Sequence, residues 1–152
     1  MTKLFSMPFA GVAMLAVSLS AGAAPVAAQN GRNGVVHIQK DCKDYNGSAG
    51  GHCTITVSNV AGIPVNKKVY YDQAAGTPTG LLDSNVVLDT GDGSSRAVGR
   101  CTLDLTTGKG LCTFSDGTGS LAGFTARVDV SSLGGTLWAW DGTFSFKSLP
   151  PK

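Results

Sequence analysis

The stretch 113–130, TFSDGTGSLAGFTARVDV, places three glycines within seven residues and then changes to a regular alternation of apolar and polar side chains. Gly117, Gly119 and Gly123 partly match the spacing of a phosphate-binding glycine loop. Such a loop binds phosphate because a helix begins directly after it and offers its free backbone N–H groups. Here the residues that follow alternate with a period of two, which is typical of a β-strand. The stretch therefore predicts a hairpin corner, with Gly119 in the positive-φ conformation of a tight connection.

Two C-terminal segments show which side of the predicted strands is buried. Segment 123–132 has an apolar residue at every second position, and segment 136–146 has a row of large aromatic residues interrupted by Gly142. A glycine in such a row leaves room for a neighbouring side chain or eases a strongly coiled strand. The residues predicted to face inward are Phe124, Ala126, Val128, Val130, Trp138, Trp140, Phe144 and Phe146.

The same period of two recurs along most of the chain, and no segment after residue 28 has apolar residues at helical spacing over the length of a helix. Short alternating segments separated by glycine-rich turns predict an all-β antiparallel sandwich or barrel of seven or eight strands. The predicted strands are 53–60, 62–72 with a bend at Pro64, 83–89, 97–105, 109–115, 123–132 and 136–146.

The N-terminal residues 1–28 have the layout of a secretory signal peptide. Lys3 supplies a positive start, an apolar and small-residue stretch follows, and Val26 and Ala28 suit a cleavage site after residue 28. A transmembrane anchor is the alternative, but prolines and glycines keep the uninterrupted apolar run below the ~20 residues of a span. We therefore expect three parts, a signal peptide at 1–28, a Gly/Asn-rich segment and loop at 29–51, and a β-barrel domain at 52–148. The predicted location is secreted or periplasmic.

The charge of the chain is small and scattered. The full sequence has 12 basic and 10 acidic residues, and removal of Lys3 with the signal leaves 11 basic residues. Nucleic-acid and anionic-membrane partners require a concentrated basic face, which the sequence lacks. We expect no nucleic-acid partner, and no membrane partner after signal cleavage.

Four cysteines, Cys42, Cys53, Cys101 and Cys112, follow the signal. An even number of cysteines in an exported chain indicates two disulfides, and the local pairing 42–53 with 101–112 is favoured among the three connectivities. Buried free thiols are the alternative for the second pair. No metal site is expected, because there is no C-x-x-C motif and the two histidines, His37 and His52, stand at no ligand spacing.

The segment 100–114 is predicted to be a hairpin with two allowed registers. A four-residue loop at 106–109 would place Cys101 diagonally from Cys112, whereas a two-residue turn would place the two cysteines directly opposite each other. Both registers bring the sulfurs near each other, but disulfide geometry is narrow.

The sequence contains no nucleophile elbow of the G-x-S-x-G type and no pair of inward-facing carboxylates. The polar groups best placed for a pocket are His52, at the start of a strand, and Tyr70 or Tyr71, of which one must point inward. The predicted ligand-binding residues are Trp138, Trp140, Phe124, Phe144, Tyr70, Tyr71 and His52. The sequence indicates no catalytic residues and no cofactor, and it does not decide whether the protein is an enzyme.

The corner at 116–123 and the aromatic last strand together resemble the allene oxide cyclase and dirigent-protein superfamily, in particular its small exported bacterial members. The similarity covers residues 97–146 and is one of pattern. It implies an eight-stranded antiparallel β-barrel, a lipocalin-like cup that acts by shape without a metal or organic cofactor. Dirigent-like barrels often associate, so the resemblance is also compatible with an oligomer.

Composition, pattern and resemblance together lead to an exported β-barrel that encloses an apolar small molecule. Two alternatives stay open at this point. One is a cofactor-free cyclase or isomerase of the allene oxide cyclase type, which confines a flexible substrate. The other is a structural envelope or surface protein with a solid core. An open cavity of roughly a few hundred Å³ with a polar group at its floor would favour the two ligand hypotheses, whereas a closed, well-packed interior would remove both.

Overall fold

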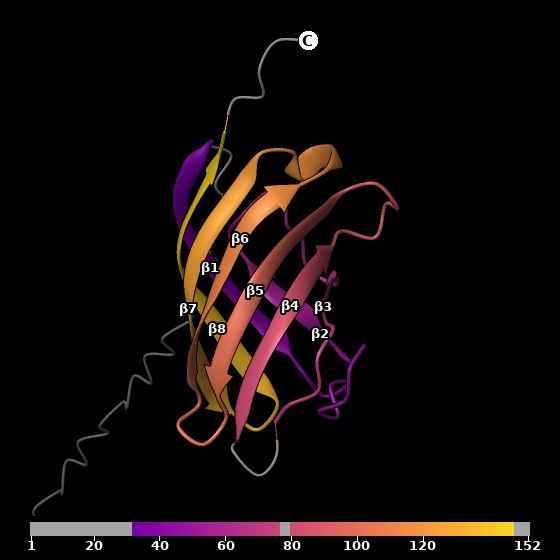
Figure 1. The fold of residues 1–152 in the computed structure, drawn as a ribbon. Helices are drawn as coiled ribbons and strands as arrows, with labels where there is room; N and C mark the ends of the chain where they lie inside the picture. Colours follow the sequence, from indigo (N-terminus) through magenta and orange to yellow (C-terminus); the bar gives the residue numbers. More distant parts are fainter. Residues whose placement is uncertain (1–31, 77–79, 148–152) are drawn as a thin grey trace, which may run out of the picture.

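The computed structural model describes residues 32–76 and 80–147, which form a closed barrel of eight antiparallel strands (Figure 1). Each strand pairs with the next one along the chain, and β1 pairs with β8 to close the barrel. The predicted all-β fold is thereby confirmed as a barrel. The strands are β1 (Asn33–Asp41), β2 (His52–Ser58), β3 (Lys68–Tyr71), β4 (Leu81–Asp89), β5 (Arg96–Asp104), β6 (Lys109–Gly117), β7 (Phe124–Gly134) and β8 (Leu137–Phe146).

The structure corrects the sequence-based boundaries at two places. The barrel begins at Asn33 and not at residue 52, because β1 belongs to the segment predicted as a Gly/Asn-rich region and loop. The predicted strand 62–72 is short, since only Lys68–Tyr71 pair as β3. The loop before β3 turns inward instead and buries Val60 and Ile63. The predicted signal peptide at 1–28 lies outside the described residues.

The glycine corner connects β6 to β7 as predicted. It contains one turn of 3₁₀ helix, η1 (Gly119–Leu121), and both Gly119 and Gly123 have positive φ angles, 58° and 76°. Leu121 in this turn has no exposed surface. The corner therefore turns the chain and also covers the upper end of the barrel in the view of Figure 1.

Both disulfides form in the local pairing, Cys42–Cys53 and Cys101–Cys112. Of the two registers considered for the β5–β6 hairpin, the structure has the one in which Cys101 lies directly opposite Cys112, with Asp104 opposite Lys109 at the end of the strands. Two disulfides indicate an oxidising environment outside the cytoplasm.

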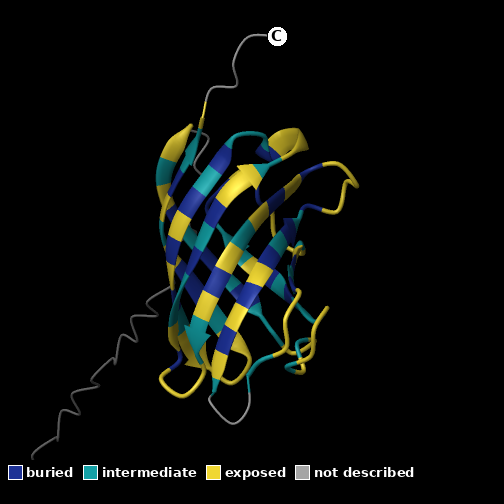
Figure 2. Ribbon diagram, viewed as in Figure 1, coloured by how far each residue is buried: buried dark blue, intermediate teal, exposed yellow. Residues whose placement is uncertain are grey.

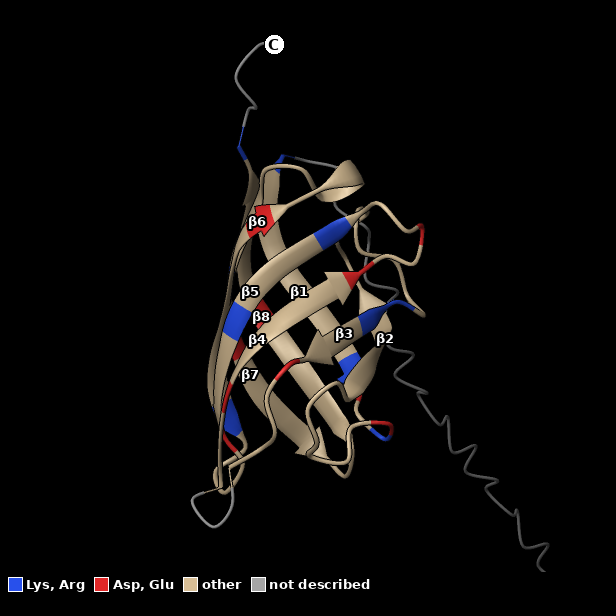
Figure 3. Cartoon of the chain, turned by 45° about the vertical axis from the view of Figure 1, so that its right-hand side comes forward, with Lys and Arg blue, Asp and Glu red and all other residues tan. Residues whose placement is uncertain are grey.

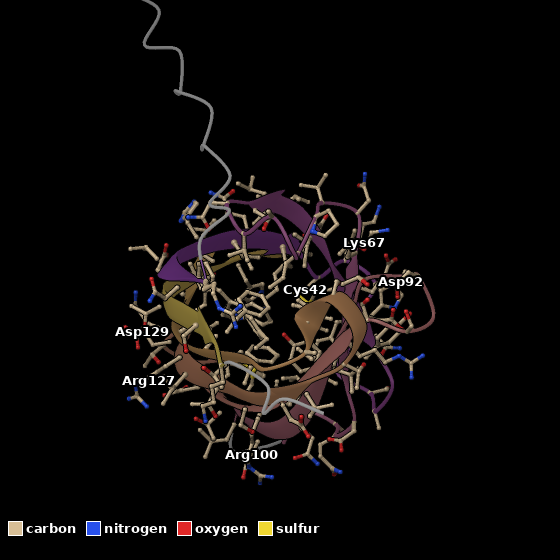
Figure 4. The ribbon with its side chains drawn as sticks, turned by 90° about the horizontal axis from the view of Figure 1, so that it is seen from above. Cys42, Lys67, Asp92, Arg100, Arg127 and Asp129 are labelled. Atoms are coloured by element: carbon tan, nitrogen blue, oxygen red, sulfur yellow. A yellow bond between two sulfur atoms is a disulfide. The ribbon has the colours of Figure 1, made fainter. Side chains whose placement is uncertain are left out.

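The interior is densely filled over most of its length. At the upper end Phe114, Phe124 and Phe144 pack together, with the ring centroids of Phe114 and Phe124 6.1 Å apart and those of Phe124 and Phe144 6.3 Å apart. Val60, Ile63 and Leu121 close this end from above, each at most 2% exposed. In the view from above, side chains occupy the interior of the barrel (Figure 4). The upper part is thus a solid core.

The outer face of the barrel is largely polar. Buried and exposed residues alternate along the strands (Figure 2), and charged residues are scattered over the surface (Figure 3). Arg100, Arg127 and Asp129 point away from the barrel (Figure 4). In the described part of the chain, no helix is long and apolar enough to cross a membrane.

Gly142 is the glycine in the aromatic row of β8, and it lies where the backbone of β7 comes very close. A Cβ atom at this position would overlap the backbone oxygen of Arg127 and lie 2.8 Å from the Cα atom of Val128. The strand is therefore able to coil tightly against its neighbour only if this residue has no side chain.

Replacing Gly142 by alanine should lower the free energy of unfolding by about 2–3 kcal/mol, because the β7–β8 pairing must open to admit the methyl group. Denaturant unfolding followed by tryptophan fluorescence measures this loss. Gly93→Ala is the control, since an added Cβ there meets nothing within 4 Å and its cost comes from a positive φ of 78°, about 1 kcal/mol. Equal losses for the two variants would contradict the close approach at Gly142.

Candidate functional site

The lower end of the barrel in the view of Figure 1 contains a cavity of about 40 Å³. Residues of the β1–β2 and β5–β6 connections are part of its lining. Leu82, Leu103 and Trp138 line its wall, and the Cys42–Cys53 disulfide and Leu105 lie at its rim. Since Leu105 is 37% exposed, the cavity reaches the surface at this rim. One water molecule needs about 10–15 Å³ of such volume, so the space suits roughly three water-sized groups.

Lys40 in β1 is the polar group of this cavity. Its side chain points into the barrel and is only 3% exposed. Its Nζ atom lies over the ring of Trp140, 4.2 Å from the ring centroid, and at the hydroxyl edge of Tyr71. None of the described residues that line the cavity carries a carboxylate. Burial without an opposite charge lowers the pKa of Lys40 from 10.5 to about 7.

Two tyrosines complete the polar part of the site. The Nζ atom of Lys40 donates a hydrogen bond to the hydroxyl oxygen of Tyr71, and Tyr71 is 4% exposed. Burial, with a smaller contribution from Tyr45, raises the pKa of Tyr71, so its phenol stays protonated through the neutral range. Tyr45 covers Tyr71 from the β1–β2 loop, with their ring centroids 5.2 Å apart. Lys40 and Tyr71 therefore form a buried pair of a weakly basic amine and a phenol.

The loop that carries Tyr45 is anchored at both ends. The Cys42–Cys53 disulfide ties the end of β1 to β2. Backbone hydrogen bonds join the loop to Tyr71, from Gly50 N to Tyr71 O (2.7 Å) and from Tyr71 N to Gly51 O (3.0 Å). These bonds continue the β2–β3 pairing past the start of β2, and the loop forms part of the cavity wall through Cys42 and Tyr45.

The structure brings together three of the residues predicted from sequence to bind a ligand. Trp138 lines the cavity, Tyr71 contacts Lys40, and Trp140 lies against the Lys40 amine. Phe124 and Phe144 belong to the solid upper core and do not border this cavity.

Tyr70 and His52 lie on the outer face of the barrel. They are opposite each other across β2 and β3, with ring centroids 5.4 Å apart, and the Nε2 atom of His52 is 3.7 Å from an oxygen of Asp44. Of the two adjacent tyrosines, Tyr71 is thus the inward one. His52 therefore provides no polar group for the lower cavity.

Lys40 is not among the residues predicted to bind a ligand, because lysine side chains are normally exposed. The signal was present in the sequence, since Val36, Ile38 and Lys40 share one face of the alternation in 33–41. If the inward-facing side of this strand continues for two residues beyond Ile38, Lys40 points into the barrel. Sequence reasoning had no comparable signal for Tyr45, which lies in a loop.

A second histidine, His37, takes part in an ion pair on the outer face of the barrel. The Nδ1 atom of His37 is 2.6 Å from the carboxylate of Asp141, and both side chains are partly exposed. Among residues 32–76 and 80–147, no group of three or more His, Cys, Asp or Glu side chains is placed to hold a metal ion.

Fold and site together define a small disulfide-bonded β-barrel with one buried lysine at its lower end. Comparison with known protein families, curated proteins and solved structures finds no match to this chain. The function must therefore be argued from the site itself.

Replacing Lys40 by methionine should remove a pH dependence of folding. Between pH 7 and 10.5 the unfolded chain binds the lysine proton and the folded chain does not, so the stability of the native protein rises with pH in this window. From pH 6.5 to 9, wild type should gain about 2.5 kcal/mol relative to K40M. Chemical denaturation at several pH values measures this difference, and K68M at an exposed lysine is the control. A difference that does not change with pH would show that Lys40 keeps an ordinary proton affinity in the fold.

Proposed function

We propose that this protein is an exported binding protein for a small molecule that has an apolar body and a carboxylate or carbonyl oxygen. The observation that carries the proposal is the buried Lys40 amine in a mostly apolar cavity whose lining contains no carboxylate among the described residues. A buried amine whose only hydrogen-bond acceptor in the described structure is a neutral phenol, Tyr71, is costly, and a ligand oxygen would supply a further acceptor. The predicted signal peptide and the two disulfides support a site of action outside the cytoplasm.

The size of the cavity limits the ligand. Sites for drug-sized molecules have volumes of roughly 300–1,000 Å³, whereas this cavity has about 40 Å³. The sequence pattern led us to expect an apolar molecule within the aromatic part of the barrel, but Phe124 and Phe144 pack against each other there. We therefore place the ligand at the lower end and expect short-chain acids or carbonyl compounds, not a fully enclosed fatty acid.

The resemblance to the allene oxide cyclase and dirigent-protein superfamily is part of this proposal. It implies an eight-stranded antiparallel barrel, which is the architecture of this chain. A structural protein with a solid core is the second candidate, and the dense packing of the upper interior favours it. The two candidates differ in whether the lower cavity takes up a ligand.

Titration of the purified, oxidised protein with acetate and butyrate, followed by tryptophan fluorescence and calorimetry, tests the proposal. Trp140 lies against the Lys40 amine and reports on ligand entry. Binding should be tightest near pH 6, where Lys40 is charged, and should weaken as the pH rises above about 7. K40M should bind at least about tenfold more weakly, because it lacks the charge-assisted hydrogen bond.

The exposed-lysine variant K68M is the matched control and should bind like wild type. Equal binding by wild type and K40M would place the ligand elsewhere. If neither acid binds to wild type at pH 6, the binding function is wrong and the solid-cored structural protein is favoured.

A further inference from the structure

We infer that Lys40 captures small aldehydes covalently, as a reversible imine with its Nζ atom inside the lower cavity. This inference rests on the proposed function and names the ligand class that the same cavity holds by a covalent bond. Three features of the site carry it, namely the environment of the amine, the neighbouring phenol and the size of the space in front of them.

The environment of the amine favours nucleophilic attack. Lys40 is surrounded by Trp140, Tyr71 and aliphatic side chains, and no carboxylate among the described lining residues holds it in the charged form. An amine desolvated in an apolar pocket is a recognised form of activated lysine nucleophile. With a pKa of about 7, a large share of the Lys40 side chain is neutral at physiological pH.

Imine formation consumes no reagent other than the aldehyde. The lone pair of Nζ attacks the carbonyl carbon, and the carbonyl π electrons move to the oxygen, which takes up a proton to give a carbinolamine. The nitrogen lone pair then forms the C=N double bond while the hydroxyl group leaves as water. The nitrogen loses its two protons, the oxygen gains two, and the sum is one imine and one water.

Tyr71 is placed to move these protons. Its hydroxyl oxygen is the hydrogen-bond partner of the Lys40 Nζ atom, so it lies next to the carbon under attack. The phenol can donate its proton to the departing hydroxyl group and recover one from nitrogen, which leaves its own charge unchanged. Tyr45, the other titratable group at this end, covers Tyr71 and belongs to the wall.

The cavity selects small aldehydes. Its volume of about 40 Å³ is suited to a carbonyl group with a short chain, and the exposed Leu105 at its rim gives the end of that chain an apolar contact at the surface. The wall residues Leu82 and Leu103 offer no hydrogen bonds to a polar substituent. Acetaldehyde and propanal therefore fit this site better than a sugar.

Reductive trapping tests the inference. The oxidised protein is incubated with propanal and cyanoborohydride at pH 7, and intact mass and peptide mapping locate the propyl groups. An exposed lysine with a pKa near 10.4 is only about 1 part in 10³ neutral at this pH. Lys40 should therefore be labelled at least about tenfold faster than the exposed lysines Lys43, Lys68 and Lys109, and labelling at 40 should level off above pH 7–8.

Variants separate the roles of the two groups. K40R keeps a basic side chain but should lose the fast labelling. Y71F keeps the ring and should label Lys40 about tenfold more slowly, with the exposed lysines unchanged. Near-ultraviolet circular dichroism of each variant checks that the aromatic core is intact.

The outcomes distinguish this inference from the proposed function. If the exposed lysines are labelled and Lys40 is not, Lys40 does not form an imine with propanal. If acetate binding nevertheless depends on Lys40, the proposed binding function is still supported. If neither acid binds and Lys40 is not labelled, the lower cavity is not a ligand-binding site and both proposals are wrong. Fast labelling at 40 that is slowed in Y71F establishes the covalent capture.

Discussion

The pairing of β1 with β8 is the constraint on which the rest of the structure depends. Nine successive residue pairs, from Asn33 with Ser145 to Asp41 with Leu137, join the first strand to the last. This pairing removes the two free edges that an open sheet of eight strands would have. It also places Lys40 directly opposite Trp138 and next to Trp140, so the register that closes the barrel also builds the environment of the buried amine.

Closure divides the interior into two unequal parts. At the upper end the β2–β3 loop and η1 insert Ile63 and Leu121 above the packed phenylalanines. At the lower end the β1–β2 loop lies across the opening and is held by the Cys42–Cys53 disulfide, which leaves a small space beside Lys40. The upper part resembles an ordinary protein core, and polar chemistry inside the described barrel is concentrated at the lower end.

A buried lysine without a carboxylate partner is costly for the folded state. The solvation of the ammonium group is lost, and the hydrogen bond to Tyr71 and the contact with Trp140 replace only part of it. Natural sequences tolerate such local conflicts mainly at functional sites. For this reason Lys40, and not the larger aromatic cluster, is the residue from which function is argued.

Much of the fold could be read from the chain itself, because inward and outward residues of a β-strand alternate whatever the neighbouring strands are. The glycine corner before Phe124, the aromatic face of β8 and the local pairing of the cysteines all follow from such short-range patterns. The inclusion of β1 in the barrel could not be predicted from such patterns, because the apolar face of this strand is short and ends in a lysine.

The sequence by itself determined the all-β class of fold and the inward direction of Trp138 and Trp140, and it favoured the local pairing of the cysteines that the structure shows. Only the tertiary structure decided that the sheet closes, that Phe124 and Phe144 fill their end of it, and that Lys40 meets Tyr71. The physical reason is that alternation fixes which side of a strand is buried but not which strands face each other across the interior. Lys40 and Tyr71 are 31 residues apart, and the pairing of both β1 and β3 with β2 brings them together on the inner face of the barrel.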